Sequence, residues 1–243
     1  MHFGRKAQPM GCNWTINVAP VMAARAAHQP PVSWAAIWMK AVALVGQRRA
    51  ALRTAYLPFP WARLYIHPFT VGTIVVERTW NGDSAVFFEQ YKAPDATPLA
   101  KLDRELRSLK TKPVEAVGGF RRMIRFSRPP APVRRLLWHI TLRWSGRLRS
   151  RYMGTYAINP FPTPGQVMQS TMPITLMIYY GLIQPNGEAP VQVLYDHRVM
   201  DGVDAYRMIR DVEATLNRDI VAELQTLGTS PADPGKEPAV LSE

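Results

Sequence analysis

The sequence predicts an α/β fold, because strand-like and helical patterns alternate along one chain of 243 residues. Three observations support this prediction. Apolar residues recur at helical spacing over 33–49, β-rich runs flank a turn within 71–92, and a strand-like run at 191–195 leads into a helical pattern near Gly202. Because 47% of the residues are hydrophobic, the chain can bury a complete core.

The N-terminal part contains one predicted strand and one predicted helix. Residues 1–12 form a lead-in without a pattern, and Trp14–Val18 has the composition of a short strand. Pro30-Pro31 breaks the chain, and Ser33 can cap a helix that reaches about Arg49. We expect the core-facing side of this helix to comprise Trp34, Ile37, Trp38, Ala41, Val42 and Val45.

A hairpin and a charged helix follow. The turn signal Asn81-Gly82-Asp83 separates two β-rich runs and predicts a hairpin over 71–92. Leucines at helical spacing predict a helix over 96–110, and Gly118-Gly119 closes this section. The leucines are Leu99, Leu102, Leu106 and Leu109.

The segment 120–151 is strongly basic. The chain carries a formal charge of +12, and ten arginines, with no lysine, lie between Arg121 and Arg151. No Asp or Glu occurs from residue 116 to residue 187, so this part of the chain favours an anionic partner. Apolar residues at helical spacing predict a basic amphipathic helix here, with Val133, Leu136, Leu137, Ile140 and Trp144 on its apolar side.

The C-terminal part returns to strands and ends in a helix. We expect a strand at 155–159, a proline-rich loop at 160–165, and a strand-like run at 172–183. The turn signal Pro185-Asn186-Gly187 then leads into the partner strand at 191–195. The apolar face of the helix that begins near Gly202 comprises Ala205, Met208, Ile209, Val212 and Leu216.

Residues 196–202, Asp-His-Arg-Val-Met-Asp-Gly, are the most informative stretch of the sequence. His197 follows the apolar strand, and histidine accepts and returns protons near neutral pH. Asp201 can pair with an arginine or cap the following helix, and Gly202 permits a tight turn. A lone histidine at a strand end is usually structural, but the complete motif between a strand and an amphipathic helix favours a catalytic role for His197.

This motif resembles the active-site signature of the dihydrolipoyl acyltransferases, the catalytic cores of 2-oxoacid dehydrogenase complexes. It is similar, more loosely, to the His-x-x-x-Asp-Gly of chloramphenicol acetyltransferase and of peptide-synthetase condensation domains. Those relatives place a second histidine before the catalytic one, whereas this chain has Asp196 there, which points to the dihydrolipoyl branch.

A second stretch agrees with the resemblance. Residues 154–159, Gly-Thr-Tyr-Ala-Ile-Asn, resemble the Gly-Thr-Phe-Thr-Ile-Ser segment of dihydrolipoyl acyltransferases. The family's serine, which donates to the oxyanion, falls on Asn159, whose amide can also donate a hydrogen bond. Thr155 and Thr163 are alternative donors. The same replacement also fits a chain that has weakened or lost the acyltransferase activity.

The resemblance implies a fold, a substrate and an assembly. The fold is a mixed β-sheet flanked by helices, chloramphenicol acetyltransferase-like. The substrate is an acyl-coenzyme A, with His197 as general base, Asn159 as oxyanion donor and Asp201 as a scaffold for the turn. The assembly is a homotrimer with active sites between subunits, so that His197 meets Asn159 of a neighbouring chain.

The resemblance also sets the expected domain organisation. We expect a single acyltransferase-like domain over 13–227, in which the basic helical segment 120–151 is an insertion without a family counterpart. Residues 228–243, rich in Pro, Gly and charge, are expected to form a flexible tail. Because no lipoyl or subunit-binding domain precedes the catalytic part, we expect a free-standing relative rather than a subunit of a large complex.

The partner of the basic segment stays open at this point. Its arginines suit a solvated or interface-facing helix, an anionic membrane surface with Trp138 and Trp144 at headgroup level, the phosphates of coenzyme A, or an acidic acyl carrier protein. Nucleic acid is the weakest candidate, because no nucleic-acid-binding motif accompanies the charge. The scattered histidines and the lack of a Cys/His cluster predict no metal site.

Two functions therefore follow from the sequence. The first is a coenzyme A-dependent acyltransferase that transfers the acyl group directly, without an acyl-enzyme. The second is a non-catalytic trimeric scaffold of the same fold that docks to a membrane or an acidic partner through its arginine-rich helix. The single cysteine, Cys12, and the lack of an apolar leader or span predict a cytoplasmic protein, with peripheral membrane attachment as an option.

Overall fold

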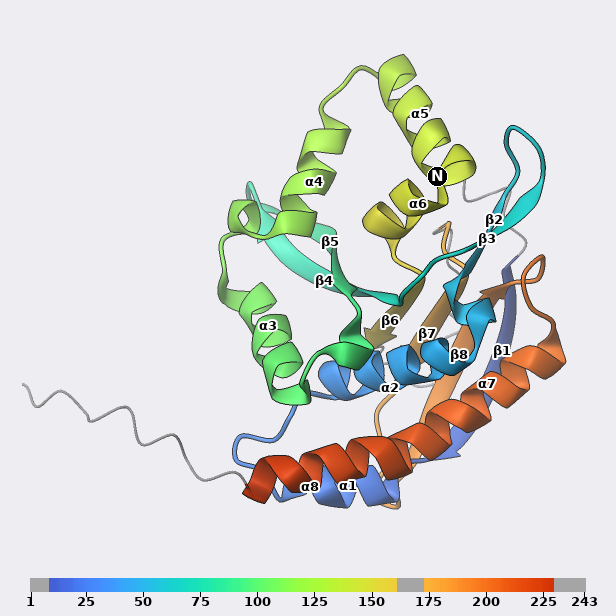
Figure 1. The fold of residues 1–243 in the computed structure, drawn as a ribbon. Helices are drawn as coiled ribbons and strands as arrows, with labels where there is room; N and C mark the ends of the chain where they lie inside the picture. Colours follow the sequence, from blue (N-terminus) through green and yellow to red (C-terminus); the bar gives the residue numbers. More distant parts are fainter. Residues whose placement is uncertain (1–8, 161–172, 230–243) are drawn as a thin grey trace, which may run out of the picture.

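A computed structural model describes residues 9–160 and 173–229 of the chain. Its centre is a six-stranded mixed sheet with the strand order β1-β8-β7-β6-β4-β5 (Figure 1). The pairs β4–β6 and β6–β7 are parallel and the other three pairs are antiparallel. The strands are β1 (Pro9–Asn17), β4 (Val71–Trp80), β5 (Asp83–Lys92), β6 (Tyr156–Pro160), β7 (Leu176–Tyr180) and β8 (Glu188–Asp196).

Two groups of helices accompany this sheet (Figure 1). In one group α3 (Leu99–Thr111) and α7 (Gly202–Thr215) pack against the central helix α2 (Trp34–Arg48), and α1 (Ala19–Ala26) packs against α8 (Val221–Thr229). The other group comprises α4 (Gly118–Ser127), α5 (Ala131–His139) and α6 (Gly146–Met153), of which α4 and α6 pack against the β4–β5 hairpin.

The remaining elements are short. A second, two-stranded sheet pairs β2 (Thr54–Leu57) with β3 (Arg63–Ile66) in antiparallel fashion. Short 3₁₀ turns cover Ala50–Arg53, Pro94–Ala96 and Val114–Ala116. Single π-helical turns at Ile140–Trp144 and Leu216–Ile220 follow α5 and α7.

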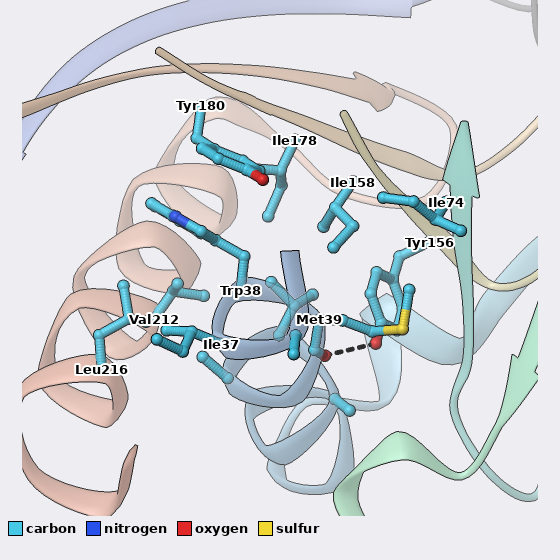
Figure 2. Packing of buried hydrophobic residues seen from close by; sticks show 14 of the residues in the cluster. Ile37, Trp38, Met39, Ile74, Tyr156, Ile158, Ile178, Tyr180, Val212 and Leu216 are labelled. Atoms are coloured by element: carbon cyan, nitrogen blue, oxygen red, sulfur yellow. Dashed lines mark hydrogen bonds between the residues drawn. The ribbon is translucent and has the colours of Figure 1, made fainter. Parts of the chain in front are cut away.

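Helix α2 forms the centre of the core because buried residues lie on almost all of its sides. Ser33 caps its first turn, and its side chain accepts a hydrogen bond from the Ala36 amide at 3.4 Å. Trp38 is fully buried and stacks on Tyr180 of β7, with ring centroids 5.2 Å apart (Figure 2). These contacts attach the helix to the middle of the sheet.

Tyr156 of β6 joins the sheet to α2 by a buried hydrogen bond. Its hydroxyl donates to the carbonyl oxygen of Met39 at 2.6 Å (Figure 2). Burial raises the pKa of the Tyr156 hydroxyl well above its ordinary value, so the group stays protonated and keeps its role as donor.

Replacing Tyr156 with phenylalanine is expected to lower the free energy of unfolding by about 1 kcal/mol, because one buried hydrogen bond is lost while the ring packing remains. Denaturant titration measures this difference. Tyr206→Phe is the matched control, since that side chain is 51% exposed on α7. Equal stability of the two variants would contradict the assigned role of the hydroxyl.

Most predicted elements are confirmed. The hairpin turns at Asn81 and Gly82, which both have positive φ as a two-residue type I′ turn requires. The helix predicted over 96–110 is α3, and its four leucines are buried. The apolar face predicted for the C-terminal helix, from Ala205 to Leu216, is buried in α7 and the turn after it.

Some boundaries are wrong. Residues 9–12 are not a loose lead-in, because they belong to β1 and pair with Val193–Asp196 of β8. Gly118-Gly119 does not separate two sections but begins α4, where a Cβ on Gly119 would lie 2.5 Å from the carbonyl oxygen of Phe88. The glycine thus lets α4 approach β5 closely.

Other differences concern lengths and unforeseen elements. The strand predicted over 172–183 is shorter, since β7 covers only five residues, and α8 reaches Thr229, so that Gly228 belongs to a helix. The elements α1, α8, β2 and β3 were not predicted. The proline-rich loop lies, apart from Pro160, outside the described residues, as does 230–243 of the predicted tail.

The basic segment is helical, as predicted, but it forms three helices instead of one. The predicted amphipathic stretch is α5 with the π-helical turn after it. None of the side chains of α5 is buried, and Val133 and Leu136 are 47% and 60% exposed. Part of the apolar stripe of this helix therefore faces outward.

Candidate active site

His197 lies in a tight turn between β8 and α7. The backbone amides of Val199 and Met200 both donate to the carbonyl oxygen of Asp196, at 2.9 and 3.3 Å. The ring of His197 is exposed at the surface of the chain, next to the buried Tyr195 ring, with the two centroids 6.3 Å apart. An exposed imidazole on a closed turn is open to a substrate and yet held in place.

The surroundings of His197 fix the roles of its two ring nitrogens. Nδ1 lies 3.2 Å from the carbonyl oxygen of Met200, and a carbonyl oxygen can only accept a hydrogen bond. The neutral ring therefore carries its proton on Nδ1, which leaves the lone pair on Nε2. Nε2 is the atom that can take a proton from a thiol or an alcohol.

Asp196 fixes this turn through the hydrogen bonds of its buried carboxylate. Its carboxylate is 2% exposed and accepts from Nε and Nη2 of Arg198 at 2.8 and 2.6 Å, and from the Arg198 amide at 3.1 Å. The paired hydrogen bonds of a guanidinium and a carboxylate are strong and directional. They fix the backbone on both sides of His197.

Two residues that are distant in the sequence, Tyr56 and Arg149, support the pair of Asp196 and Arg198. The guanidinium of Arg198 stacks over the ring of Tyr56 in β2, 4.4 Å from its centroid. The carbonyl oxygen of Tyr56 accepts from Nη1 of the buried Arg149 at 2.8 Å. Burial lowers the pKa of Arg149 to about 10, and the nearby Asp196 carboxylate opposes this shift, so Arg149 stays charged at neutral pH.

Asp201 caps helix α7, which is one of the two roles that the sequence suggested. Its Oδ1 accepts a hydrogen bond from the Asp204 amide at 2.8 Å, and its carbonyl oxygen accepts from Ala205. The cap fixes where α7 begins and hence where the turn with His197 ends. The other suggested role was pairing with an arginine. None of the ion pairs found among the described residues involves Asp201.

Asn159 is far from His197 within one chain. It pairs with Tyr179 of β7, which pairs with Gln192 of β8, and His197 follows Gln192 by five residues. At about 3.3 Å per residue and about 4.8 Å per strand, the two residues are roughly 16 Å apart along the sheet and roughly 10 Å apart across it. A single chain therefore does not bring this predicted pair together.

The segment before Asn159 depends on glycine and on a buried threonine. Gly154 has φ +79°, and a Cβ there would lie 2.3 Å from Oγ1 of Thr73, so only glycine fits. Oγ1 of Thr155 accepts from the Val71 amide at 3.0 Å and is buried. The hydroxyl of Thr155 thus has a structural partner, whereas Thr163, the other alternative donor, lies outside the described residues.

The sequence reasoning missed Arg149 and Tyr56. Arg149 is one of ten arginines in the basic segment, and no feature of its sequence neighbourhood distinguishes it. Tyr56 lies on β2, a short strand that carries no alternating pattern. The burial of an arginine against the strand end of β8 is a tertiary feature.

Two features that would indicate other protein classes are not found in the described ranges. Among 9–160 and 173–229, no three His, Cys, Asp or Glu side chains are placed to hold a metal ion. No helix in these ranges has the length and apolar character needed to cross a bilayer.

The fold is that of the chloramphenicol acetyltransferase-like acyltransferase domains, with a mixed sheet flanked by helices. Three solved structures illustrate the likeness. The cubic core of a pyruvate dehydrogenase multienzyme complex shares a TM-score of 0.64 at 15% identity, over 92% of this chain and 86% of the other. Dihydrolipoamide acetyltransferase of Azotobacter vinelandii gives a TM-score of 0.62 at 15% identity, with the same coverage.

The third structure is a chloramphenicol acetyltransferase, with a TM-score of 0.53 at 13% identity over 88% of this chain and 92% of the other. No protein-family model matches the sequence, and no curated protein matches it. The likeness therefore lies in the fold.

Proposed function

We propose that the chain is a coenzyme A-dependent acyltransferase with His197 as its general base. The observation that carries this proposal is the turn at the end of β8, where an exposed imidazole has Nδ1 against a carbonyl oxygen and Nε2 available as the base. The turn stands in a fold shared with dihydrolipoamide acetyltransferase and chloramphenicol acetyltransferase.

The reaction follows from this geometry. Nε2 of His197 takes the proton from the attacking thiol, hydroxyl or amine, which then adds to the thioester carbonyl of the acyl-coenzyme A. The tetrahedral intermediate collapses, the carbon–sulfur bond breaks, and the imidazolium returns the proton to the departing thiolate. The acyl group passes directly from one substrate to the other, without an acyl-enzyme.

The spacing of the site residues agrees with a studied relative. The Azotobacter enzyme was investigated for the catalytic roles of a serine, a histidine and an asparagine, and the latter two are four positions apart. His197 and Asp201 have the same spacing in this chain. We assign Asp201, which caps α7, the role of holding the turn rather than of touching substrate.

Asn159 is proposed to donate its amide to the oxyanion from a neighbouring chain. Within one chain the two residues are far apart, so a shared site requires an assembly in which one chain supplies His197 and the next supplies Asn159. A homotrimer with three such interfaces provides this arrangement. The cubic core formed by one structural relative shows that this fold supports oligomers.

A complementation experiment tests the proposal. Chains with His197→Ala and chains with Asn159→Ala are each expected to be inactive, but co-assembled chains regain complete sites wherever an intact His197 faces an intact Asn159. If the two variants are mixed in equal amounts and assemble at random in a head-to-tail ring, half of the chains supply an intact His197 and half supply an intact Asn159. About a quarter of the interfaces then hold a complete site. The readout is free coenzyme A, separated chromatographically from acetyl-, propionyl- or longer acyl-coenzyme A, because transfer to a thiol acceptor leaves the total thiol concentration unchanged.

The controls separate the parts of this proposal. Mixtures of each variant with itself should stay inactive. Full activity of wild-type monomers, isolated at low concentration, would contradict the composite site, and wild-type turnover no faster than buffer would contradict the enzyme.

The second candidate is a non-catalytic scaffold of the same fold, and one observation favours it. Val133, Leu136 and Trp144 are between 47% and 60% exposed on and next to α5, and arginines surround them. Such a surface suits docking to an anionic membrane. Sedimentation with anionic and neutral vesicles at low and high salt tests this, and equal binding to both vesicle types would contradict the electrostatic docking.

A further inference from the structure

Two adjoining cavities lie among α4, α6 and the β4–β5 hairpin, away from the turn that carries His197. One has a volume of about 320 Å³ and the other of about 460 Å³, which places both in the size range of ligand pockets. Both cavities are lined by Gln90 and Arg122, so they meet at these two side chains.

The smaller cavity is mainly apolar and aromatic. Phe126 packs against Trp138 and Tyr152, with ring centroids 4.8 and 4.7 Å apart, and these three rings form one wall. Phe88, Met123 and Met153 contribute further apolar lining. A cavity lined in this way favours an apolar chain over water.

The larger cavity is basic. Lys92, Arg122, Arg147 and Arg151 line it together with His67, and its lining contains no carboxylate. Burial is the main cause that lowers the pKa of His67, so this ring is neutral at neutral pH and the four other groups carry the charge. None of the ion pairs found in the described ranges involves these four side chains.

Arg122 stands at the junction and has an unused donor. Its Nη2 donates to Oε1 of Gln90 at 2.8 Å, whereas its Nε is buried and has no hydrogen-bond partner among the described residues. An unsatisfied buried donor costs free energy that an acceptor at the same place would recover. Arg122 therefore places a positive charge where the two cavities meet.

This site is separate from the candidate active site. Neither lining contains Asp196, His197 or Asn159. Lys92 pairs with Val71 at the end of the β4–β5 ladder, four strands across the sheet from β8, which corresponds to roughly 19 Å.

We infer that the two cavities form one binding site for an amphipathic phosphate ester, with its apolar chain in the aromatic cavity and its phosphate in the basic one. The aromatic wall takes the chain, the four cations neutralise the phosphate, and Arg122 contacts the ligand where the two parts join. The inference rests on the lining of the cavities and does not depend on the proposed transferase activity.

The test uses dodecyl phosphate as the probe, titrated calorimetrically into the wild-type chain below the micellar concentration of the probe. We expect one site per chain, with tighter binding than for inorganic phosphate, which lacks the chain, and than for dodecanol, which lacks the charge. Binding of inorganic phosphate as tight as that of dodecyl phosphate would overturn the proposal, because the aromatic cavity would then contribute nothing.

Two variants locate the site. Arg147→Glu with Arg151→Glu, both exposed positions on α6, should weaken dodecyl phosphate binding by at least about tenfold, since two charge-assisted contacts become repulsive. Arg125→Glu with Arg135→Glu is the matched control, because it makes the same charge change at exposed positions that line neither cavity. Equal weakening by both pairs would show that only the overall charge matters and would overturn the site.

A third variant tests the apolar part. Ser127→Trp places a large side chain at an exposed lining position of the aromatic cavity and should weaken dodecyl phosphate binding without changing the melting temperature. Unchanged affinity in this variant would contradict the placement of the chain. Lysophosphatidic acid and lauroyl-coenzyme A, compared in the same titration, then distinguish a lipid from an acyl carrier as the source of the phosphate ester.

Discussion

Replacing His197 with alanine is expected to lower the rate of acyl transfer by about 10²–10⁴-fold while the fold remains intact. The rate falls because the substitution removes the imidazole that takes the proton from the attacking nucleophile. The fold remains because the ring is exposed and, among the residues that the structure describes, makes one polar contact, at 3.2 Å to the Met200 carbonyl oxygen. Formation of free coenzyme A at saturating acetyl-coenzyme A, measured by chromatography, gives the change in rate.

The control for this prediction removes a different histidine. His28 lies after α1, remote in sequence from the motif, and His28→Ala should leave the transfer rate unchanged. Melting curves of both variants establish that they are folded. If His197→Ala turned over acyl-coenzyme A as fast as the wild type, the imidazole would have no part in the chemistry and the scaffold function would be favoured.

Replacing Asp196 with asparagine is expected to lower the free energy of unfolding by about 3 kcal/mol, because it removes one partner of a buried ion pair. The carboxylate is 2% exposed, accepts two hydrogen bonds from the guanidinium of Arg198, and lies near the buried charge of Arg149. Without it, the buried guanidinium of Arg149 and the partly buried guanidinium of Arg198 lose this negative charge. Denaturant titration measures the loss.

The same substitution should affect the turn with His197. The Asp196 side chain holds the Arg198 amide, and its backbone carbonyl closes the turn, so a loosened anchor lets the imidazole leave its position at Met200. We expect transfer activity to fall with stability. Asp83→Asn, at the exposed hairpin turn, is the matched control for loss of one carboxylate.

A double-mutant cycle isolates the pair. Asp196→Asn combined with Arg198→Gln should be less destabilising than the sum of the two single changes, because either change alone already breaks the ion pair between these two residues. Additive effects would show that Asp196 and Arg198 act independently, and the anchor would then be assigned incorrectly.

The sequence was sufficient where local chemistry decides the structure. The hairpin follows from Asn81 and Gly82, which adopt positive φ easily, and α2 follows from the Ser33 cap and its apolar spacing. The candidate site motif could be located because a strand, a histidine and a helix start are encoded within a dozen consecutive residues.

The sequence was insufficient where distant segments meet. Residues 9–12 have no strand pattern, yet they extend β1 because β8 offers an unpaired edge for backbone hydrogen bonds. Helices α1 and α8 are short and depend on packing against each other and against the turn after α7. Their formation depends on partners that are far away in the sequence.

By itself the sequence located the residues of the candidate site: a histidine between a strand and a capped helix, with an acidic residue on either side of it, in a strongly basic chain. Only the tertiary structure decided how these groups are used. It buried Arg149 near Asp196, placed Asn159 two strands across the sheet and five residues along it from His197, and enclosed an aromatic and a basic cavity among the arginine-rich helices. The physical reason is that burial, pairing register and cavity shape arise from contacts between distant segments, which local residue patterns do not encode.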